Sequence, residues 1–328
     1  MIARRVLLTG GAGFIGRWVV RELLAGGSGT TRFDPPQLVI LDNLENGSED
    51  NLADFADDPN LARFVLGDVV DQALIDSLFT EFDFDLVLHL AAKINVQESI
   101  DAPAGVFEAD VAGTFHLLER ARQAGAAFAF MSTCMVYGRS TDPGGIAETH
   151  PTLCASPYAG AKLAAENMVE SYHRAYGMRT VILRPFNTYG PFQKASGEGG
   201  VVSIFLQREM TGDTLDIYGD GTQTRDLLYV EDCAAFCVTA AMCDEAVGRV
   251  INAGTGRDIT INELAAQICR APERIRHIPH IHPQAEIQKL QANVKVAEQL
   301  FEWRPRVSLE EGITRTRTWI KNKLPKVK

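Results

Sequence analysis

The chain has 328 residues, of which 46% are apolar and 23% charged, and its formal net charge is -10. This length predicts about two structural units, and the composition is that of a folded globular protein. An acidic chain disfavours a nucleic-acid-binding surface, which needs clustered Lys and Arg to neutralise phosphates. No stretch approaches the ~18 apolar residues that a membrane helix needs, and the first ten residues lack a signal-peptide pattern, so we expect a cytoplasmic protein without a membrane partner.

The cysteines and histidines do not predict a metal site. The six cysteines contain no C-x-x-C pair and no Cys/His spacing of the zinc type, so we expect reduced thiols. Three histidines lie close together in the last fifth of the chain, but prolines interrupt their spacing. These are His277, His280 and His282, with Pro279 and Pro283 between and beside them.

Short apolar strands alternate with helical patterns through the first half of the chain. Strands are predicted at Arg5 to Leu8, Leu38 to Leu41, Arg63 to Leu66, Leu86 to Leu90, Ala127 to Ser132 and Arg179 to Arg184. Helices are predicted at Gly16 to Ala25, Asp71 to Thr80, Val106 to Ala124 and Pro157 to Tyr176. Strict alternation predicts an α/β fold with a doubly wound parallel sheet, the Rossmann arrangement.

After Pro185 the alternation gives way to segments that contain Gly and Pro. We therefore expect a dinucleotide-binding unit at residues 1–185 and a smaller α/β substrate-binding unit that takes most of residues 186–328. The pattern from Tyr229 to Ala253 is again helix then strand, so we expect the chain to rejoin the first unit around residues 226–254.

A glycine-rich turn follows the first predicted strand and leads into an amphipathic helix. In Gly10-Gly11-Ala12-Gly13-Phe14-Ile15-Gly16, the first glycine permits a tight turn and Gly13 lets backbone N–H groups approach a pyrophosphate. Gly16 lets the helix pack closely on the sheet, and the helix N-terminus, with Phe14 and Ile15, supplies partial positive charge. This context predicts a dinucleotide cofactor.

The ends of the next strands predict the rest of the cofactor site. Asp42 closes the second strand, where its carboxylate can accept hydrogen bonds from ribose hydroxyls and would repel a 2′-phosphate, so we expect NAD rather than NADP. The other residues expected to contact the cofactor follow the second, third and fourth strands: Asn43, Asp68, Val69, Leu90, Ala91, Ala92 and Lys93. Lys93 could touch cofactor or substrate, or be an exposed lysine.

Tyr158 and Lys162 stand four residues apart at the start of a predicted helix, so both side chains project from one face. A free tyrosine is only about 0.1% ionised at neutral pH, and lowering its pKa to about 7 needs roughly 4 kcal/mol of stabilisation of the phenolate. A neighbouring ammonium and a nicotinamide cation can supply this in a pocket with little water. Thr133, which follows an apolar strand, can bring a hydroxyl to the same substrate oxygen.

With these residues together, the chain resembles the extended short-chain dehydrogenase/reductases of the nucleotide-sugar epimerase/dehydratase family, almost from end to end. The segments that carry the resemblance are Gly10 to Gly16, His89 to Ala92, Ser132 to Gly138, Tyr158 with Lys162, Arg184 to Pro191, and Gly219 to Asp226.

The resemblance implies a role for each of these residues. Tyr158 takes the proton of a sugar hydroxyl as hydride moves to NAD, Lys162 also holds the nicotinamide ribose, and Thr133 binds the reacting oxygen. Asn187 and Arg225 would hold the diphosphate of a UDP- or dTDP-sugar, Arg225 through charge-assisted hydrogen bonds. The family also implies a homodimer formed through the helices Val106 to Ala124 and Pro157 to Tyr176.

The two residues after Thr133 bear on which reaction follows oxidation. In similar enzymes that eliminate water across carbons 5 and 6 of the sugar, Asp and then Glu stand there, whereas this chain has Cys134 and Met135. Because Met cannot exchange a proton, the leading hypothesis is a 4-epimerase that passes through a transient 4-keto sugar. A dehydratase of atypical chemistry, or a C3/C5 epimerase, that uses Cys134 as acid/base stays open.

Two further positions depart from the family pattern. Asp110 stands where similar sequences commonly have Asn, and the segment His282 to Glu286 lacks an expected arginine. A third hypothesis, from another class of protein, is a non-catalytic dinucleotide sensor, but a sensor would not need Thr133, Tyr158 and Lys162 together.

Overall fold

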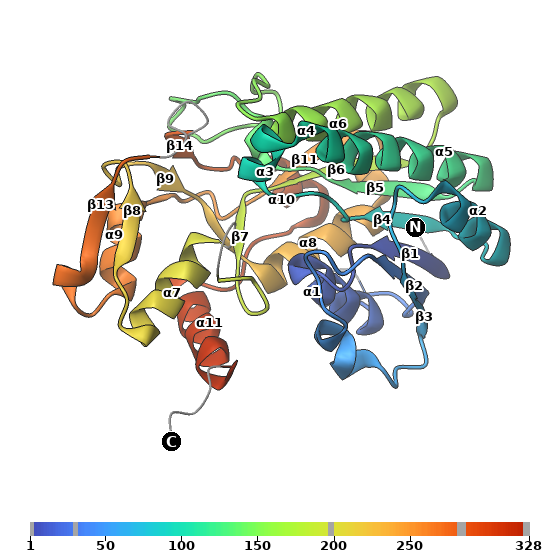
Figure 1. The fold of residues 1–328 in the computed structure, drawn as a ribbon. Helices are drawn as coiled ribbons and strands as arrows, with labels where there is room; N and C mark the ends of the chain where they lie inside the picture. The colour runs from blue at the N-terminus through green and yellow to red at the C-terminus, as the bar shows by residue number, and fades with distance from the viewer. Residues whose placement is uncertain (1–2, 29–31, 196–199, 281–286, 324–328) are drawn as a thin grey trace.

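The centre of the structure, a computed structural model that describes residues 3–28, 32–195, 200–280 and 287–323, is a seven-stranded parallel sheet. In spatial order the strands are β11 (Arg249–Ala253), β6 (Thr180–Pro185), β5 (Ala127–Met131), β4 (Leu86–His89), β1 (Arg5–Thr9), β2 (Gln37–Asp42) and β3 (Leu61–Leu66). The order reverses between β1 and β4, which places the switch point of the sheet beside the glycine turn. The predicted doubly wound Rossmann sheet is confirmed (Figure 1).

Helices cover both faces of this sheet (Figure 1). On one face lie α1 (Phe14–Leu24), α8 (Val230–Met242) and α10 (Lys295–Phe301); on the other lie α2 (Gln72–Glu81), α5 (Thr114–Ala124) and α6 (Pro157–Tyr176). Consecutive residues of β1 serve opposite faces, because Val6 and Leu8 pack with the first group of helices and Leu7 with the second. The central strands β1, β2, β4 and β5 are therefore buried along almost their whole length.

The stretch from Val106 to Ala124 is helical throughout, as predicted, but most of its first half is a π-helix. After α3 (Val96–Asp101), the chain forms the short helix α4 (Pro103–Val106), then the π-helical segment η2 (Phe107–Gly113), and only then α5. A π-helical turn takes one more residue than an α-helical turn, so it changes which side chains face inward. In this chain it turns Asp110 into the interior.

The second unit is built from short strands and helices beyond β6. Its strands pair as β7 (Asn187–Tyr189) with β10 (Leu227–Tyr229), β8 (Leu215–Tyr218) with β13 (Ile275–Ile278), and β9 (Thr224–Arg225) with both β12 (Ile259–Thr260) and β14 (Lys289–Leu290). Its helices are α7 (Val201–Thr211), α9 (Ile261–Ile268) and α11 (Leu309–Lys323). They share one apolar core with β8 and β10, separate from the cores of the large sheet.

The chain crosses between the two units more than once. After β10, α8 packs against α1 of the first unit, and β11 pairs in parallel with β6 at the edge of the large sheet. Short 3-10 turns complete the described elements: η1 (Glu49–Phe55), η3 (Cys134–Val136), η4 (Asp244–Ala246) and η5 (Pro272–Arg274). Within the described residues, no helix combines the length and the apolar character needed to cross a bilayer.

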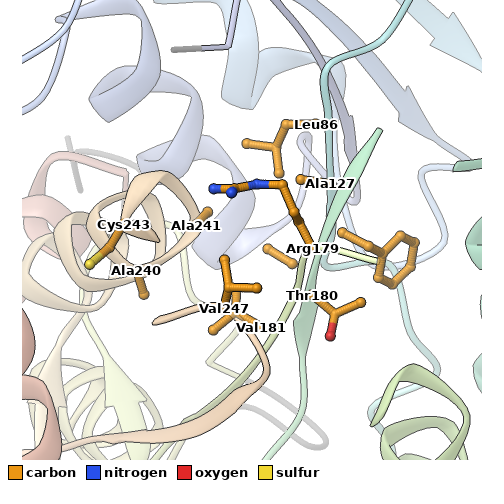
Figure 2. A pocket seen from close by; sticks show the side chains of 11 residues that line it. Leu86, Ala127, Arg179, Thr180, Val181, Ala240, Ala241, Cys243 and Val247 are labelled. Atoms are coloured by element: carbon orange, nitrogen blue, oxygen red, sulfur yellow. The ribbon is translucent and has the colours of Figure 1, made fainter. Parts of the chain in front are cut away.

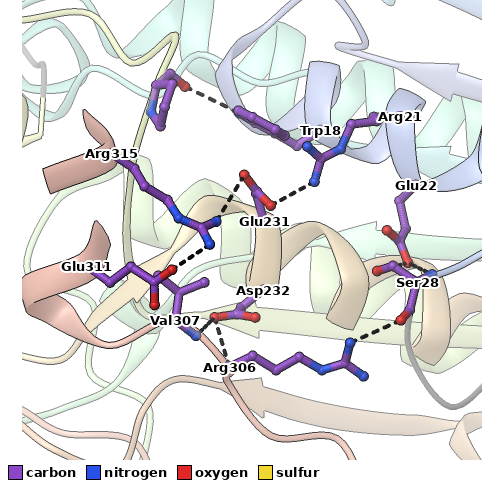
Figure 3. A network of polar contacts seen from close by, with 11 residues as sticks. Trp18, Arg21, Glu22, Ser28, Glu231, Asp232, Arg306, Val307, Glu311 and Arg315 are labelled. Atoms are coloured by element: carbon purple, nitrogen blue, oxygen red, sulfur yellow. Dashed lines mark hydrogen bonds and ion pairs between the residues drawn. The ribbon is translucent and has the colours of Figure 1, made fainter. Parts of the chain in front are cut away.

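A polar network fixes the C-terminal segment to α1 and α8 (Figure 3). Glu231 of α8 accepts a hydrogen bond from Arg21 of α1 at 2.9 Å and forms an ion pair with Arg315 of α11 at 3.6 Å. The adjacent Asp232 accepts hydrogen bonds from the backbone N–H groups of Arg306 and Val307, each at 3.0 Å. The last helix is thereby held against helices of the first unit, although its apolar side belongs to the second.

Candidate active site

The glycine turn lies at the carboxyl end of β1, where ligands of open parallel sheets bind. Gly10 has a φ of 75°, and a Cβ there would come within 2.7 Å of the backbone nitrogen of Ala91. A Cβ on Gly16 would lie 2.0 Å from the carbonyl oxygen of Gly10, so only glycine lets α1 pack this closely. The turn therefore brings the N-terminus of α1, with Phe14 and Ile15, directly to the edge of the sheet.

Asp42 lies beside this turn. Its two carboxylate oxygens accept hydrogen bonds from the backbone N–H groups of Ala12 at 2.9 Å and Leu44 at 2.8 Å. Asn43, the next residue after β2, donates a hydrogen bond at 2.7 Å to Asp68, which follows the neighbouring strand β3. Val69, the residue after Asp68, packs into the core. The structure brings these predicted cofactor residues to one edge of the sheet.

The segment after β4 closes the other side of the turn. The N–H of Leu90 donates to the carbonyl oxygen of Thr9 at 3.1 Å, and the N–H of Ala91 donates to the Thr9 hydroxyl at 3.2 Å. Ala92 and Lys93 follow in the chain. The Lys93 ammonium contacts Glu45 at 2.5 Å and Glu98 at 3.6 Å. The Lys93 side chain therefore reaches the loop that follows β2, at the carboxyl ends of the strands.

Thr133, Tyr158 and Lys162 converge at the carboxyl end of β5. Ser156 caps α6 by accepting a hydrogen bond from Ala159 N–H at 3.2 Å, which sets both side chains on the first turns of that helix. Tyr158 is 8% exposed and hydrogen-bonded to the Thr133 side chain, and Lys162 is 2% exposed.

The Lys162 ammonium is held from two sides. It donates a hydrogen bond to the carbonyl oxygen of Met131 at 3.1 Å, and it lies 4.9 Å from the centre of the Phe130 ring. Two of its three N–H donors are left for other acceptors. The geometry suits the ribose hydroxyls of a dinucleotide that lies along the glycine turn.

The burial and the charges around Tyr158 and Lys162 explain why formation of the Tyr158 phenolate needs a further positive charge. Burial raises the pKa of the Tyr158 phenol above its ordinary value, the charge of Asp110 adds to this, and the nearby Thr133 side chain acts in the opposite direction. Burial also lowers the pKa of Lys162, against the attraction of Asp110 and Glu166. An added cation beside the phenol would favour the phenolate. The glycine turn, Asp42 and the Tyr158–Lys162 pair therefore fit an oxidised nicotinamide dinucleotide.

Cys134 lies beside Thr133 but points into an apolar cluster with Val136, Tyr137 and Ile146. Burial raises the pKa of its thiol to about 12, so at neutral pH the side chain is protonated. The charge of Arg225 and the nearby Thr133 side chain act in the opposite direction, while Asp226 adds to the effect of burial. Cys134 therefore keeps its proton and is poorly suited to act as a base.

The predicted substrate residues come from the second unit. The side-chain oxygen of Asn187 is buried and has no hydrogen-bond partner among the residues described. Arg225 donates hydrogen bonds to the carbonyl oxygens of Thr224 at 2.7 Å and Ile287 at 2.9 Å, and its charge acts on the Cys134 thiol. Arg225 is therefore near the Thr133 cluster, and two backbone carbonyl oxygens hold its guanidinium.

His277 and His280, the two histidines of the C-terminal group that the structure describes, make separate contacts. His277 is 2.9 Å from the side-chain oxygen of Asn262, and the ring of His280 lies against Tyr218. His282, like the segment to Glu286 that departs from the family pattern, falls outside the described residues. In the part of the chain that the structure does describe, no group of three His, Cys, Asp or Glu residues is arranged to hold a metal ion.

The sequence patterns did not single out the ion pair of Arg184 and Glu166. Arg184 Nε donates to Glu166 at 2.8 Å, and the two side chains are only 5% and 4% exposed. Glu166 stands eight residues after Tyr158 on α6, so the pair ties the catalytic helix to β6. The only available signal was an arginine within the otherwise apolar strand β6.

A pocket at the amino ends of the strands is not a candidate site. It lies among the first residues of β4, β5 and β6 and the end of α8, including Leu86, Ala127 and Val181 (Figure 2). Its volume of about 10 Å³ holds roughly one water molecule at most. It is also at the amino ends of the strands, away from the glycine turn.

Comparison with known proteins agrees with this arrangement. Residues 6–254 match the model of the NAD dependent epimerase/dehydratase family. The UDP-glucose 4-epimerase of Mycolicibacterium smegmatis is 36% identical, and the alignment covers 97% of this chain and 99% of that protein. The crystal structure of Pal from Bacillus thuringiensis is 52% identical with a TM-score of 0.93, covering 98% of this chain and 100% of the other.

A second solved structure carries the cofactor. DesIV, a dTDP-glucose 4,6-dehydratase from Streptomyces venezuelae solved with NAD bound, is 31% identical with a TM-score of 0.85, and the match covers 97% of each chain. The similar proteins thus include both epimerases and dehydratases. The chain belongs to the NAD-dependent epimerase/dehydratase family, as its sequence motifs predict.

Proposed function

We propose that this protein is an NAD-dependent nucleotide-sugar 4-epimerase that acts through a transient 4-keto sugar. The observation that carries the proposal is the convergence of Thr133, Tyr158 and Lys162 next to Cys134 and Met135, which do not form an acid/base pair. Water elimination across carbons 5 and 6 needs a base there, and neither a thioether nor a thiol with a raised pKa supplies one. A 4-epimerase needs none.

Each residue then has a task at one C–OH group. Bound NAD supplies the hydride acceptor. Tyr158 Oη takes the hydroxyl proton, Lys162 stabilises the resulting phenolate and orients the cofactor ribose, and Thr133 donates a hydrogen bond to the carbonyl oxygen that forms. Tyr158 returns its proton when the hydride comes back on the other face of the sugar. Asn187 and Arg225 would hold the diphosphate, which leaves the sugar free to turn.

The substrate we propose is a UDP- or dTDP-sugar, the classes named for similar proteins. The experiment incubates the enzyme with a panel of these nucleotide sugars in deuterated water and analyses the products by NMR. Simple 4-epimerisation is expected to give the C4 epimer with no deuterium bound to carbon, because the migrating hydride never exchanges with solvent. Deuterium at carbon 3 or 5, or a lost hydroxyl, would overturn it.

A second candidate reaction is favoured by Cys134. Its protonated thiol beside Thr133 could return a proton to a carbon next to the transient ketone after that carbon has lost its own proton to a base, as a C3/C5 epimerase or an atypical dehydratase requires. In the same NMR experiment this reaction would leave deuterium at carbon 3 or 5. Cys134→Ala would then remove the deuterated product, whereas a plain 4-epimerase would keep its product with this substitution.

We further propose that Asp42 makes the enzyme select NAD over NADP. In Asp42→Asn, loss of the carboxylate is expected to weaken NAD binding roughly tenfold to a hundredfold and to reduce the preference over NADP, because a charged acceptor and a repulsive charge both disappear. Binding of each cofactor is measured by calorimetry. Asp68→Asn, one strand further along, is the control and should leave the ratio of the two affinities unchanged. An unchanged ratio in Asp42→Asn would refute the assignment.

We also propose a homodimer, formed through α5 and α6 with their flanking turn η2. Large apolar side chains are exposed along this face: Phe107 is 60%, Phe115 44% and Tyr176 59% exposed. A second copy of the same face would cover them, as expected for an isologous interface.

A further inference from the structure

Asp110 is a buried carboxyl group that the proposed reaction does not yet use. It lies in η2, which packs against α6, and its exposure is 0%. One carboxylate oxygen, Oδ1, accepts a hydrogen bond from the backbone N–H of Lys93 at 2.7 Å. The other, Oδ2, is buried without a hydrogen-bond partner among the described residues. A buried carboxylate with one unsatisfied oxygen is costly, so its retention calls for a reason.

A chain of hydrogen bonds holds the backbone of Asp110 in place. The Thr114 hydroxyl donates to the Asp110 carbonyl oxygen at 2.7 Å, so it can only accept from Nε2 of His89, 2.9 Å away. Nδ1 of His89 must then accept from the Thr9 hydroxyl at 2.7 Å. Burial lowers the pKa of His89 to about 3, so the ring is neutral as this pattern requires. The chain joins the glycine turn to the π-helical segment.

The charges that act on Asp110 come from three neighbouring elements. Lys162 of α6 is the strongest attraction, followed by the Lys93 backbone and side chain, while Glu45 repels it. Within η2 itself Glu108 is exposed, and α4 brings no ionisable side chain. The ionisable side chains of α5 pair elsewhere, namely His116 and Arg120 with Asp76, and Arg122 with Glu119.

The influence is mutual and reaches the phenol. Asp110 favours the charged form of Lys162, and it disfavours ionisation of Tyr158. Burial raises the pKa of Asp110 and lowers that of Lys162, and the attraction between the two groups opposes both shifts. This attraction therefore favours the charged form of each group.

We propose that ionised Asp110 is a positioning residue that holds Lys162 protonated and keeps Tyr158 in the phenol form until a second positive charge enters the cleft. This rests on the proposed function, in which Tyr158 is the base. Without the cofactor, the negative charge of Asp110 already compensates the positive charge of Lys162. Ionisation of Tyr158 would then add a negative charge that no cation compensates. An oxidised nicotinamide ring restores the balance. Proton removal is thereby linked to the oxidised cofactor, and an Asn at this position would weaken the link.

The test is an ultraviolet absorbance titration of tyrosinate in the protein saturated with NAD, with the Tyr158→Phe titration subtracted. Asp110→Asn keeps the shape and the acceptor for Lys93 N–H but removes the charge. Tyr158 is expected to ionise about 1 to 2 pH units lower in Asp110→Asn than in the parent, because a nearby negative charge has gone. Asp110→Ser removes the same charge and serves if the asparagine variant does not fold.

Glu45→Gln is the matched control. It removes a carboxylate from the same edge, but Glu45 is not among the groups that shift Tyr158 or Lys162, so the titration is expected to stay as in the parent. An unshifted or upward-shifted titration in Asp110→Asn, or an equal shift in Glu45→Gln, would overturn the inference. If the parent itself shows no Tyr158-dependent ionisation below the ordinary pKa of tyrosine, the proposed role of Tyr158 fails instead.

Discussion

Replacing Tyr158 by Phe is expected to lower kcat by about 10³- to 10⁴-fold, while NAD stays bound. The substitution removes one oxygen atom, which is the only group of this side chain that can take the sugar proton. The buried ring keeps its packing, so the fold and the glycine turn should be unaffected. Turnover is measured with the substrate found in the NMR panel, and bound NAD is measured after denaturation of the purified variant.

Tyr172→Phe is the control for this prediction. Tyr172 lies on the same helix, and its hydroxyl donates to Glu119 at 3.0 Å, away from the cleft. Its loss is expected to leave kcat within about twofold of the parent, as for a single peripheral hydrogen bond. A Tyr158→Phe enzyme with parental kcat would remove Tyr158 from the mechanism, and equal losses in both variants would indicate a general defect of α6.

Glu166→Gln is expected to lower the free energy of unfolding by about 3 to 5 kcal/mol. The change leaves the Arg184 guanidinium charged and buried between α6, β6 and the Tyr137 ring, 4.6 Å away. A buried charge without its counter-ion costs far more than a lost surface contact. Urea unfolding followed by circular dichroism measures the loss.

The same helix offers a matched control one turn further on. Glu170 pairs with Arg174 at 2.5 Å, but these side chains are 43% and 74% exposed. Glu170→Gln is therefore expected to cost no more than about 0.5 kcal/mol. If the two variants lose similar stability, the Arg184–Glu166 pair is not the brace of the catalytic helix that its burial indicates.

The strands and most helices around the cofactor site could be predicted because their signals are local. Leu38 to Leu41 is a short apolar run that a polar loop and a single aspartate delimit, and a strand formed there. The interval from Val106 to Ala124 is different, since its apolar spacing is compatible with a helix throughout. The π-helical turn is linked to distant residues, because Thr114 donates to the Asp110 carbonyl oxygen and is itself hydrogen-bonded to His89 of β4.

The order of residues along the chain was by itself enough to identify the glycine turn, the acid after the second strand and the four-residue spacing of Tyr158 and Lys162. Each of these depends on a turn, a strand end or one helical repeat, which neighbouring residues determine. Tertiary structure decided that Arg184 pairs with Glu166, that Cys134 keeps its proton, and that the charge of Lys162 acts on Asp110. Burial and electrostatic attraction act through space between residues far apart in sequence, so only the packed chain determines them.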